Sequence, residues 1–159
     1  VRIVSGGLIR TFAGNGEAKS AGDGGPATAA SLNSPSGLAV DAAGNVFVLE
    51  EFGARVRRID ASGNITTIAG SDVEGFLGDG GPATQARLRG PRLGIAVDRS
   101  GNVYFSDTEN NRIRVIRAAP PRLSVEPAAI SLRANAGGLS APASLMVRGD
   151  VMGVQVQRQ

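Results

Sequence analysis

The stretch Gly22-Asp-Gly-Gly-Pro-Ala-Thr28 decides the fold, because it recurs unchanged as Gly78-Asp-Gly-Gly-Pro-Ala-Thr84. Further matches stand in register around it: Ile9-Arg-Thr-Phe-Ala-Gly14 with Ile65-Thr-Thr-Ile-Ala-Gly70, Ala39-Val-Asp41 with Ala96-Val-Asp98, and Arg55-Val-Arg57 with Arg112-Ile-Arg114. The offset is 56 residues at first and 57 residues after an insertion near Leu93. Self-similarity at a fixed period indicates a repeat architecture. The chain is therefore interpreted as a series of structural repeats.

Each repeat predicts four short strands. In the better-covered repeat they lie at residues 38–41, 46–49, 55–59 and 65–68, and β-branched and aromatic residues are frequent in them. Gly37 and Ala39 in the first of these strands are small, as a strand close to a crowded axis requires. Short strands with a turn signal about every ten residues are typical of an all-β sandwich, barrel or propeller.

The turns between these strands share the pattern Asp-x-x-Gly-Asn. Asp accepts backbone N–H groups at the start of such a turn, and Gly supplies a positive φ. An EF-hand calcium loop needs several acidic ligands, and each of these turns contains a single Asp. We therefore predict structural turns and no metal at Asp41, Gly44, Asn45, Asp60, Gly63, Asn64, Asp98, Gly101 and Asn102.

The identical seven-residue stretch lies in the connection between repeats. Pro26 and Pro82 suit the first position of a short helical turn. Asp23 and Asp79 are expected to bond within their own loop. A phosphate-binding loop is excluded, because no Lys-Ser/Thr follows the glycines. The predicted structural residues of this connection are Asp23, Gly25, Pro26, Asp79, Gly81 and Pro82.

The pattern Gly-Asp-Gly-Gly-Pro-Ala-Thr, Ala-Val-Asp-x-x-Gly-Asn and Asn-Arg-Ile-Arg resembles the bacterial NHL repeat, a blade of a β-propeller. The resemblance covers about residues 1–117, and similar repeats occur in teneurin propellers and in large secreted bacterial proteins. It implies a propeller of six or a similar number of blades, used mainly as a binding platform. Residues 50–54 depart from the Asp-x-x-Asn-Asn that the family has there, so the turn at this point is left open.

The predicted fold is all-β: about two and a half four-stranded NHL blades over residues 1–117, then an incomplete β-sandwich-like segment. Residues 118–121 form a Pro-rich linker, and residues 122–159 resemble the start of an immunoglobulin-like module or are a poorly ordered tail. Because propellers need about four to eight blades, we expect this chain to be the C-terminal part of a longer protein. The parent chain would supply the remaining blades and the outer strand that the last blade lacks.

Composition argues against catalysis by this chain. It contains no Cys, His or Trp, which excludes disulfides, cysteine nucleophiles, Cys/His zinc sites and His general bases within it. Glu50 and Glu51 are adjacent, so on a strand they point to opposite faces. We predict no enzyme, no cofactor and no metal. The alternative is a propeller enzyme of lyase or lactonase type, with its metal site in blades outside this chain.

A binding role remains, through a protein or glycan partner. The net charge of +3 is small and no block of five like charges occurs, so nucleic acid is not the expected partner. Arginines of the third strands either bind an acidic partner or, as we favour, cover apolar surface while pairing with Glu50, Asp60 or Asp107. The candidate contact residues are Glu51, Phe52, Arg55, Glu109 and Arg112.

Location is inferred from the resemblance alone. No apolar run approaches 18 residues, so this chain contains no predicted membrane span. The family and the immunoglobulin-like tail imply an extracellular, periplasmic or cell-surface protein.

Overall fold

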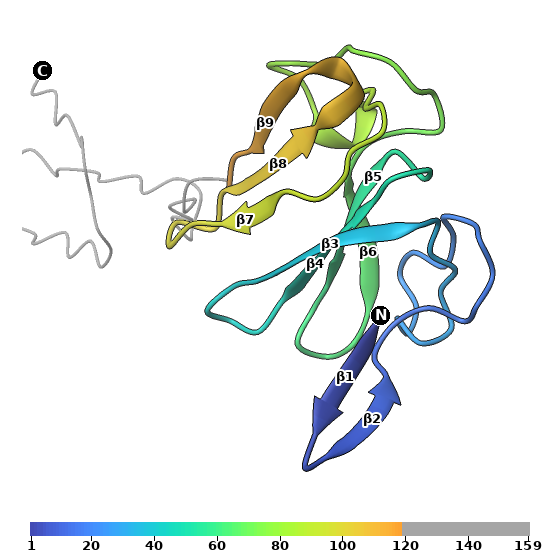
Figure 1. Cartoon of the computed structure of the whole chain (residues 1–159). Helices are drawn as coiled ribbons and strands as arrows, with labels where there is room; N and C mark the ends of the chain where they lie inside the picture. The colour runs from blue at the N-terminus through green and yellow to red at the C-terminus, as the bar shows by residue number, and fades with distance from the viewer. Residues whose placement is uncertain (119–159) are drawn as a thin grey trace, which may run out of the picture. The chain divides into compact units, whose positions relative to one another are not determined.

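The computed structural model describes residues 1–118, as nine strands in three antiparallel sheets (Figure 1). The predicted immunoglobulin-like segment at 122–159, and the linker after Ala118, lie outside the described residues. The strands are β1 (Arg2–Ser5), β2 (Leu8–Thr11), β3 (Pro35–Val40), β4 (Val46–Glu50), β5 (Arg55–Ile59), β6 (Ile65–Ala69), β7 (Ile95–Val97), β8 (Val103–Asp107) and β9 (Arg112–Ile116). The predicted all-β class with partial propeller blades is confirmed.

The three sheets correspond to one complete blade and two partial ones. Strands β3, β4, β5 and β6 form the complete blade, in which each strand pairs with the next along the chain. Strands β7 to β9 repeat its first three strands, and β1 and β2 correspond to its last two. The strand periodicity of the sequence therefore matches the observed meander closely.

The innermost strands approach one another because their residues are small. Strand β3 lies beside β7. A Cβ atom added to Gly37 would lie only 3.2 Å from Cγ2 of Ile95. Close approach of the two blades at this point thus depends on the missing side chain.

The one-residue insertion in the second repeat is visible where the chain enters β7. Leu93 adopts a φ of +71° and is 80% exposed. Strand β7 has only three residues, whereas its counterpart β3 has six. The extra residue is therefore accommodated outside the sheet, at some cost in backbone strain.

The apolar core lies between blades and the connections that precede them. Leu32 packs with Val48, Ile59 and Ile65 of the complete blade. Its repeat counterpart Leu88 joins a second cluster with Leu49 and Phe105, which belong to neighbouring blades. The connection between repeats is thus a packing element that fills the space between sheets. No helix in residues 1–118 is long and apolar enough to cross a membrane.

Each Asp-x-x-Gly-Asn turn is closed by its own Asp side chain. Oδ1 of Asp41 accepts the N–H groups of Ala43 at 2.9 Å and Asn45 at 2.8 Å, and the Asn45 amide donates to Oδ2. Gly44 has a φ of +83°. Asp60 and Asp98 accept the equivalent backbone N–H groups of their own turns. The carboxylates are therefore engaged by the turns themselves.

These hydrogen bonds make stability depend on pH in acid. Hydrogen bonds from Asn45 and Asn102 lower the pKa of Asp41 and Asp98 below the ordinary value of 3.8. Because the pKa of each carboxyl is lower in the folded than in the unfolded protein, the ionised carboxylates stabilise the fold fully above pH 3.8. This stabilisation is lost as the pH falls through the pKa of the folded state. We expect urea titrations at pH 7 to show that the double variant carrying Asp41→Asn and Asp98→Asn is less stable than the wild-type protein, and that this difference in stability shrinks below pH 3.8. A difference that does not vary with pH would contradict this assignment.

Candidate functional site

The two ends of the blades differ in how variable their loops are. In an antiparallel meander, successive connections alternate between the ends. The three Asp-x-x-Gly-Asn turns, at 41–45, 60–64 and 98–102, therefore lie at one end. The other end, which we call the loop end, carries residues 15–20, 51–54, 71–77 and 108–111, whose sequences differ between repeats. A site particular to this protein is best sought at the loop end.

A hollow of about 320 Å³ lies at the loop end of the complete blade. Three separate connections form it, and we call it the Phe52 hollow. Its side chains include Lys19, Ser20, Phe52, Arg55, Asp72 and Glu74. Phe52 is 69% exposed, and Arg55 forms an ion pair with Asp72. The hollow thus combines an uncovered aromatic ring with side chains of both charges.

The turn that carries Phe52 keeps the backbone form of its counterpart despite the different sequence. Ala54 has a φ of +47°, and Asn111, in the matching position, has a φ of +53°. A Cβ on Gly53 would clash with Oγ of Ser20 and lie 2.9 Å from Oε2 of Glu50. Residues 50–54 therefore build the same kind of turn as 107–111, held close to the preceding connection.

Beneath this turn lies a buried ion cluster around Arg57, which we call the Arg57 cluster. Its guanidinium donates to Glu50 at 3.3 Å, to Asp23 at 2.7 Å and to the carbonyl oxygen of Ala21 at 3.2 Å. Arg57 and Glu50 are fully buried. Burial raises the pKa of Glu50 although Arg57 is adjacent. Burial also raises the pKa of Asp23, but Thr67 and Arg57 outweigh that effect and leave it lowered.

The same cluster is repeated in the next blade. Arg114 donates to Asp79 at 2.6 Å, to Asp107 at 3.4 Å and to the carbonyl oxygen of Arg87 at 2.7 Å. The expectation that Asp23 and Asp79 bond within their own loops is therefore wrong. Each instead joins its connection to the third strand of the following blade, because a buried guanidinium there needs a second carboxylate.

The favoured interpretation of the third-strand arginines is right in part. Arg57 and Arg114 pair with Glu50 and Asp107, but they do so in the interior rather than over a surface. Within residues 1–118, Asp60 forms no ion pair, since its carboxylate closes its own turn. The sequence held a signal for these clusters, because the Arg and both of its acidic partners recur at the repeat offset.

The five candidate contact residues do not form one group. Phe52 and Arg55 line the Phe52 hollow, whereas Glu51 pairs with Arg92 of the next blade at 3.0 Å. Glu109 pairs with Arg89 at 3.2 Å. The guanidinium of Arg112 lies 3.8 Å from the ring centre of Phe76, a residue of the loop end. Only Phe52 and Arg55 therefore share a hollow.

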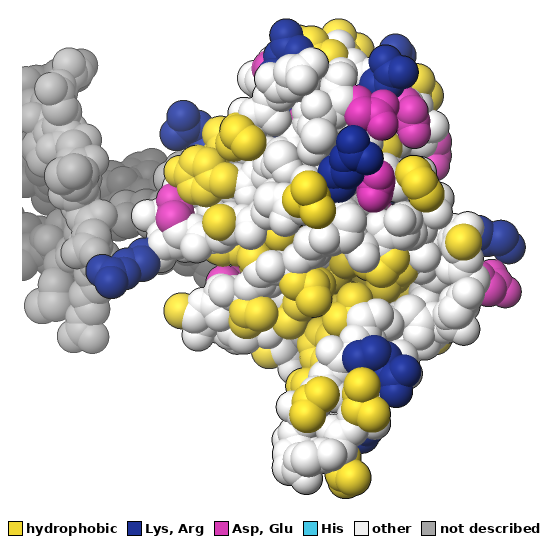
Figure 2. Space-filling view, viewed as in Figure 1, with side chains coloured by type: hydrophobic (Ala, Val, Ile, Leu, Met, Phe, Trp, Pro, Cys, Tyr) yellow, Lys and Arg dark blue, Asp and Glu magenta, His cyan; other side chains and the backbone are white. Residues whose placement is uncertain are grey.

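The geometry does not support a pair of catalytic carboxylates at Glu50 and Glu51. Glu50 is buried in an ion pair with Arg57, whereas Glu51 forms an ion pair with Arg92, so the two carboxylates do not face a common substrate site. Over the part of the chain that the structure describes, no three Asp or Glu side chains are grouped as a metal ion would require. Figure 2 shows basic, acidic and apolar side chains interspersed around β8 and β9.

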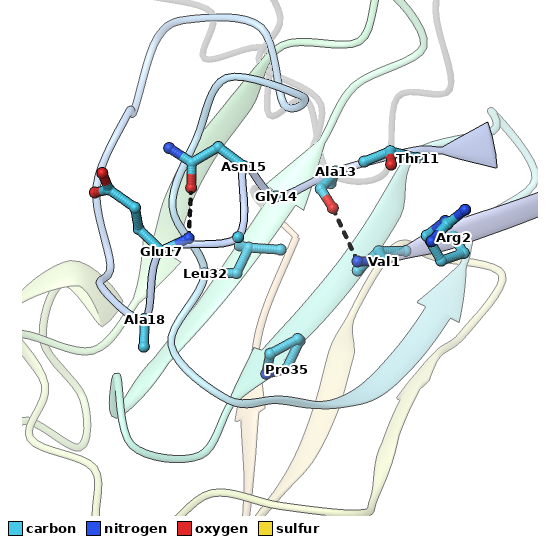
Figure 3. A pocket seen from close by; sticks show the side chains of 11 residues that line it. Val1, Arg2, Thr11, Ala13, Gly14, Asn15, Glu17, Ala18, Leu32 and Pro35 are labelled. Carbon is cyan, nitrogen blue, oxygen red and sulfur yellow. Dashed lines mark hydrogen bonds between the residues drawn. The ribbon is translucent and has the colours of Figure 1, made fainter.

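A larger pocket, of about 450 Å³, lies beside Val1 (Figure 3). Its wall includes Leu32 and Pro35, and the amino group of Val1 donates to the carbonyl oxygen of Ala13 at 2.8 Å. Leu32 is the repeat counterpart of Leu88, which packs with Leu49 of the adjacent blade. The pocket thus corresponds to a packing position between blades.

Comparison with known proteins points to the same repeat. Residues 9–75 match the family described as Teneurin NHL domain. Teneurin-1 of Mus musculus is 38% identical over 112 residues, which cover 62% of this chain and 4% of that protein. Teneurin-3 of Danio rerio is 34% identical over 119 residues, covering 65% of this chain and 4% of that protein. The chain thus spans a small fraction of the length of these relatives.

A solved structure is similar in fold. It is the crystal structure of a structural genomics protein of unknown function from Bacteroides thetaiotaomicron. It aligns with a TM-score of 0.63 at 23% identity, over 72% of this chain and 28% of that one. At this identity the likeness extends to the NHL-like fold.

Proposed function

We propose that this chain is a non-catalytic protein-binding segment of a longer propeller protein and that its loop end contacts the partner. The exposed ring of Phe52 beside the Phe52 hollow is the observation that carries the proposal. Aromatic side chains that enter a partner's surface supply much of the energy at protein interfaces. At the opposite end, the Asp side chains of the three Asp-x-x-Gly-Asn turns are already engaged by their own turns.

Charges around Phe52 support a protein partner over a nucleic acid. Lys19, Arg55, Asp72 and Glu74 line the hollow with both signs. Mixed charge favours complementary pairing with a protein surface, whereas a phosphate backbone requires a basic patch. Glu51, Glu109 and Arg112 would contribute at the rim of the interface, where their present ion pairs can be exchanged.

The surroundings of this segment form part of the proposal. We place it in a bacterial protein of the cell surface, the periplasm or the extracellular space. Residues 1–117 would form blades, 118–121 a linker and 122–159 the start of an immunoglobulin-like module, and the parent chain would supply the remaining blades. The similarity to teneurin NHL domains supports the binding role and the blades.

Site-directed cross-linking tests the proposed interface. A photo-reactive amino acid at position 52 of the whole protein identifies a partner, whose affinity is then measured with purified components. We expect Phe52→Ser to weaken binding about tenfold to thirtyfold, as loss of an interface anchor worth about 2 kcal/mol requires. Leu8→Ser is the matched control, since Leu8 is 67% exposed on the β1–β2 hairpin.

The outcomes separate the candidate partners. Equal affinity of the Phe52→Ser and wild-type proteins would refute the loop-end proposal. Loss of binding after enzymatic removal of the partner's sugars would assign recognition to a glycan instead. Turnover of the partner during the assay would favour the alternative of a propeller enzyme.

A further inference from the structure

Leu93 is the residue by which the second repeat is longer than the first. Its neighbours Arg92 and Gly94 correspond to Ser36 and Gly37, which are adjacent in the first repeat. The Leu93 side chain is 80% exposed and belongs to neither apolar cluster of residues 1–118. The inserted side chain therefore adds nothing to the packing of either cluster.

The backbone at Leu93 is strained. Its φ of +71° lies in the left-handed region, where the Cβ atom of an ordinary L-residue crowds a carbonyl oxygen. Glycine and asparagine adopt this conformation more readily. A leucine held there without packing is thus an unfavourable choice for the fold itself. Backbone strain of this kind concentrates at binding and catalytic sites, so Leu93 is a candidate for a role other than folding.

Hydrogen bonds from two blades hold the chain just before Leu93. In the complete blade, Oγ of Ser36 donates to the carbonyl oxygen of Pro91 at 3.5 Å. In the next blade, Oγ1 of Thr108 donates to the carbonyl oxygen of Arg92 at 3.3 Å. Thr108 belongs to the loop end, so Leu93 lies at this end, where the two blades meet. The exposed side chain therefore stands on a supported piece of backbone.

An ion pair connects Leu93 with Phe52. Nη1 of Arg92 lies 3.0 Å from Oε1 of Glu51. Leu93 directly follows the arginine, and Phe52 directly follows the glutamate. Both apolar side chains are exposed, at 80% and 69%. The junction of the two blades thus presents two exposed apolar side chains that are linked through one ion pair.

We propose that Leu93 is a second anchor for the protein partner of the loop end, with Phe52 as the first, an inference that rests on the proposed function. The partner that fits is a protein surface with one apolar recess for each side chain and polar groups for the Arg92–Glu51 ion pair. A leucine offers no hydrogen bond to the hydroxyl groups of a sugar, so the second anchor favours a protein over a glycan. Because the anchors belong to different blades, recognition depends on how these two blades are joined.

A matched pair of variants of the whole protein separates binding from folding. Leu93→Asn suits the left-handed backbone but lacks the apolar side chain, so its Tm should equal or exceed that of wild type. It should bind the purified partner, identified by cross-linking at position 52, about fivefold to twentyfold more weakly, because a buried leucine contact is lost. Leu93→Met keeps the strain and an apolar side chain, and its affinity should stay within about twofold of wild type. Equal affinity of Leu93→Asn and wild type would overturn the proposal. So would a Tm of Leu93→Asn well below that of Leu93→Met, since the leucine would then serve the fold.

Thiol labelling shows whether Leu93 is open in the whole protein and covered in the complex. Residues 1–159 contain no cysteine, so Leu93→Cys and Phe52→Cys each add a single thiol to this segment. Both should react rapidly with iodoacetamide in the free protein and be protected by saturating purified partner, with the labelled peptide located by mass spectrometry. Slow labelling at position 93 without partner would overturn the proposal, because another part of the whole chain would then cover Leu93.

The outcomes distinguish this inference from the proposed function. Protection at position 52 without protection at position 93 would overturn the second anchor and leave the loop-end interface standing. Capture of no partner through position 52 would refute the proposed function and the second anchor together. Cross-linking of position 93 to a second copy of the same protein would assign the leucine to self-association and overturn the proposal.

Discussion

Replacing Arg57 by Met lowers the free energy of unfolding by about 3–5 kcal/mol, the cost of leaving a buried carboxylate without its partner. Glu50 has no exposed surface, and the positive charge nearest to it would be lost. Chemical denaturation at pH 7 of the whole protein measures the change. If the variant does not fold, its rate of proteolysis relative to wild type supplies a second measurement.

Two further variants show whether the charge causes the loss. Arg58→Met is the matched control: Arg58 is the next residue of β5, is exposed and donates to Asn45, so its loss should cost less than about 1 kcal/mol. Arg57→Met/Glu50→Leu removes both charges and should recover part of the stability. Equal stability of the Arg57→Met and Arg58→Met proteins would refute the assignment of a buried ion cluster.

Gly70→Ala is expected to lower the free energy of unfolding by about 2–5 kcal/mol. About 1–2 kcal/mol of this comes from the left-handed backbone conformation, which alanine adopts with strain, and about 1–3 kcal/mol from the backbone shift that the added Cβ forces. Gly70 directly follows β6 and has a φ of +92°, and an added Cβ would clash with the carbonyl oxygen of Ala54 and lie 2.9 Å from Cα of Arg55. Both neighbours are backbone atoms, so a side-chain rotation cannot relieve the overlap. Thermal unfolding and urea titration measure the loss.

Gly63→Ala separates the two costs. Gly63 has a φ of +85° and nothing within 4 Å of an added Cβ. This variant should show the backbone strain alone, about 1–2 kcal/mol. Equal losses at Gly63 and Gly70 would mean that the turn at Ala54 moves freely and that close approach contributes little.

The local features of the fold were predictable from sequence because they depend on neighbouring residues. The strand at 55–59 and the turn at 60–64 coincide with the structure, since β-propensity and Asp-Gly turn chemistry act over a few residues. The partner of Asp23 was not predictable in this way. Arg57 lies 34 residues away from it, and a guanidinium is ordinarily assigned to the surface.

The candidate site shows the same division. Phe52 was identified because it stands in a divergent turn, and it is exposed. The hollow beside it forms where the connections at 18–20 and 71–74 meet this turn. The sequence pattern of a single repeat does not indicate that these three segments meet. Arg112 was proposed as a contact, but the ring of Phe76 already lies against its guanidinium. Comparison of the repeats could not indicate this pairing, because the first repeat has Ser20 in place of Phe76.

The Arg57 cluster also sets where one blade ends and the next begins. Asp23 belongs to the connection that precedes the complete blade, yet it bonds to the third strand of that blade, and Gly24 and Gly25 bond to its fourth strand. The unit that holds itself together is therefore residues 21–69, and its edges do not coincide with the first and last residues of the sheet. Blades exchanged between related proteins should be cut within residues 70–76 and their counterparts, because a cut at the start of β3 would separate an arginine from its acid.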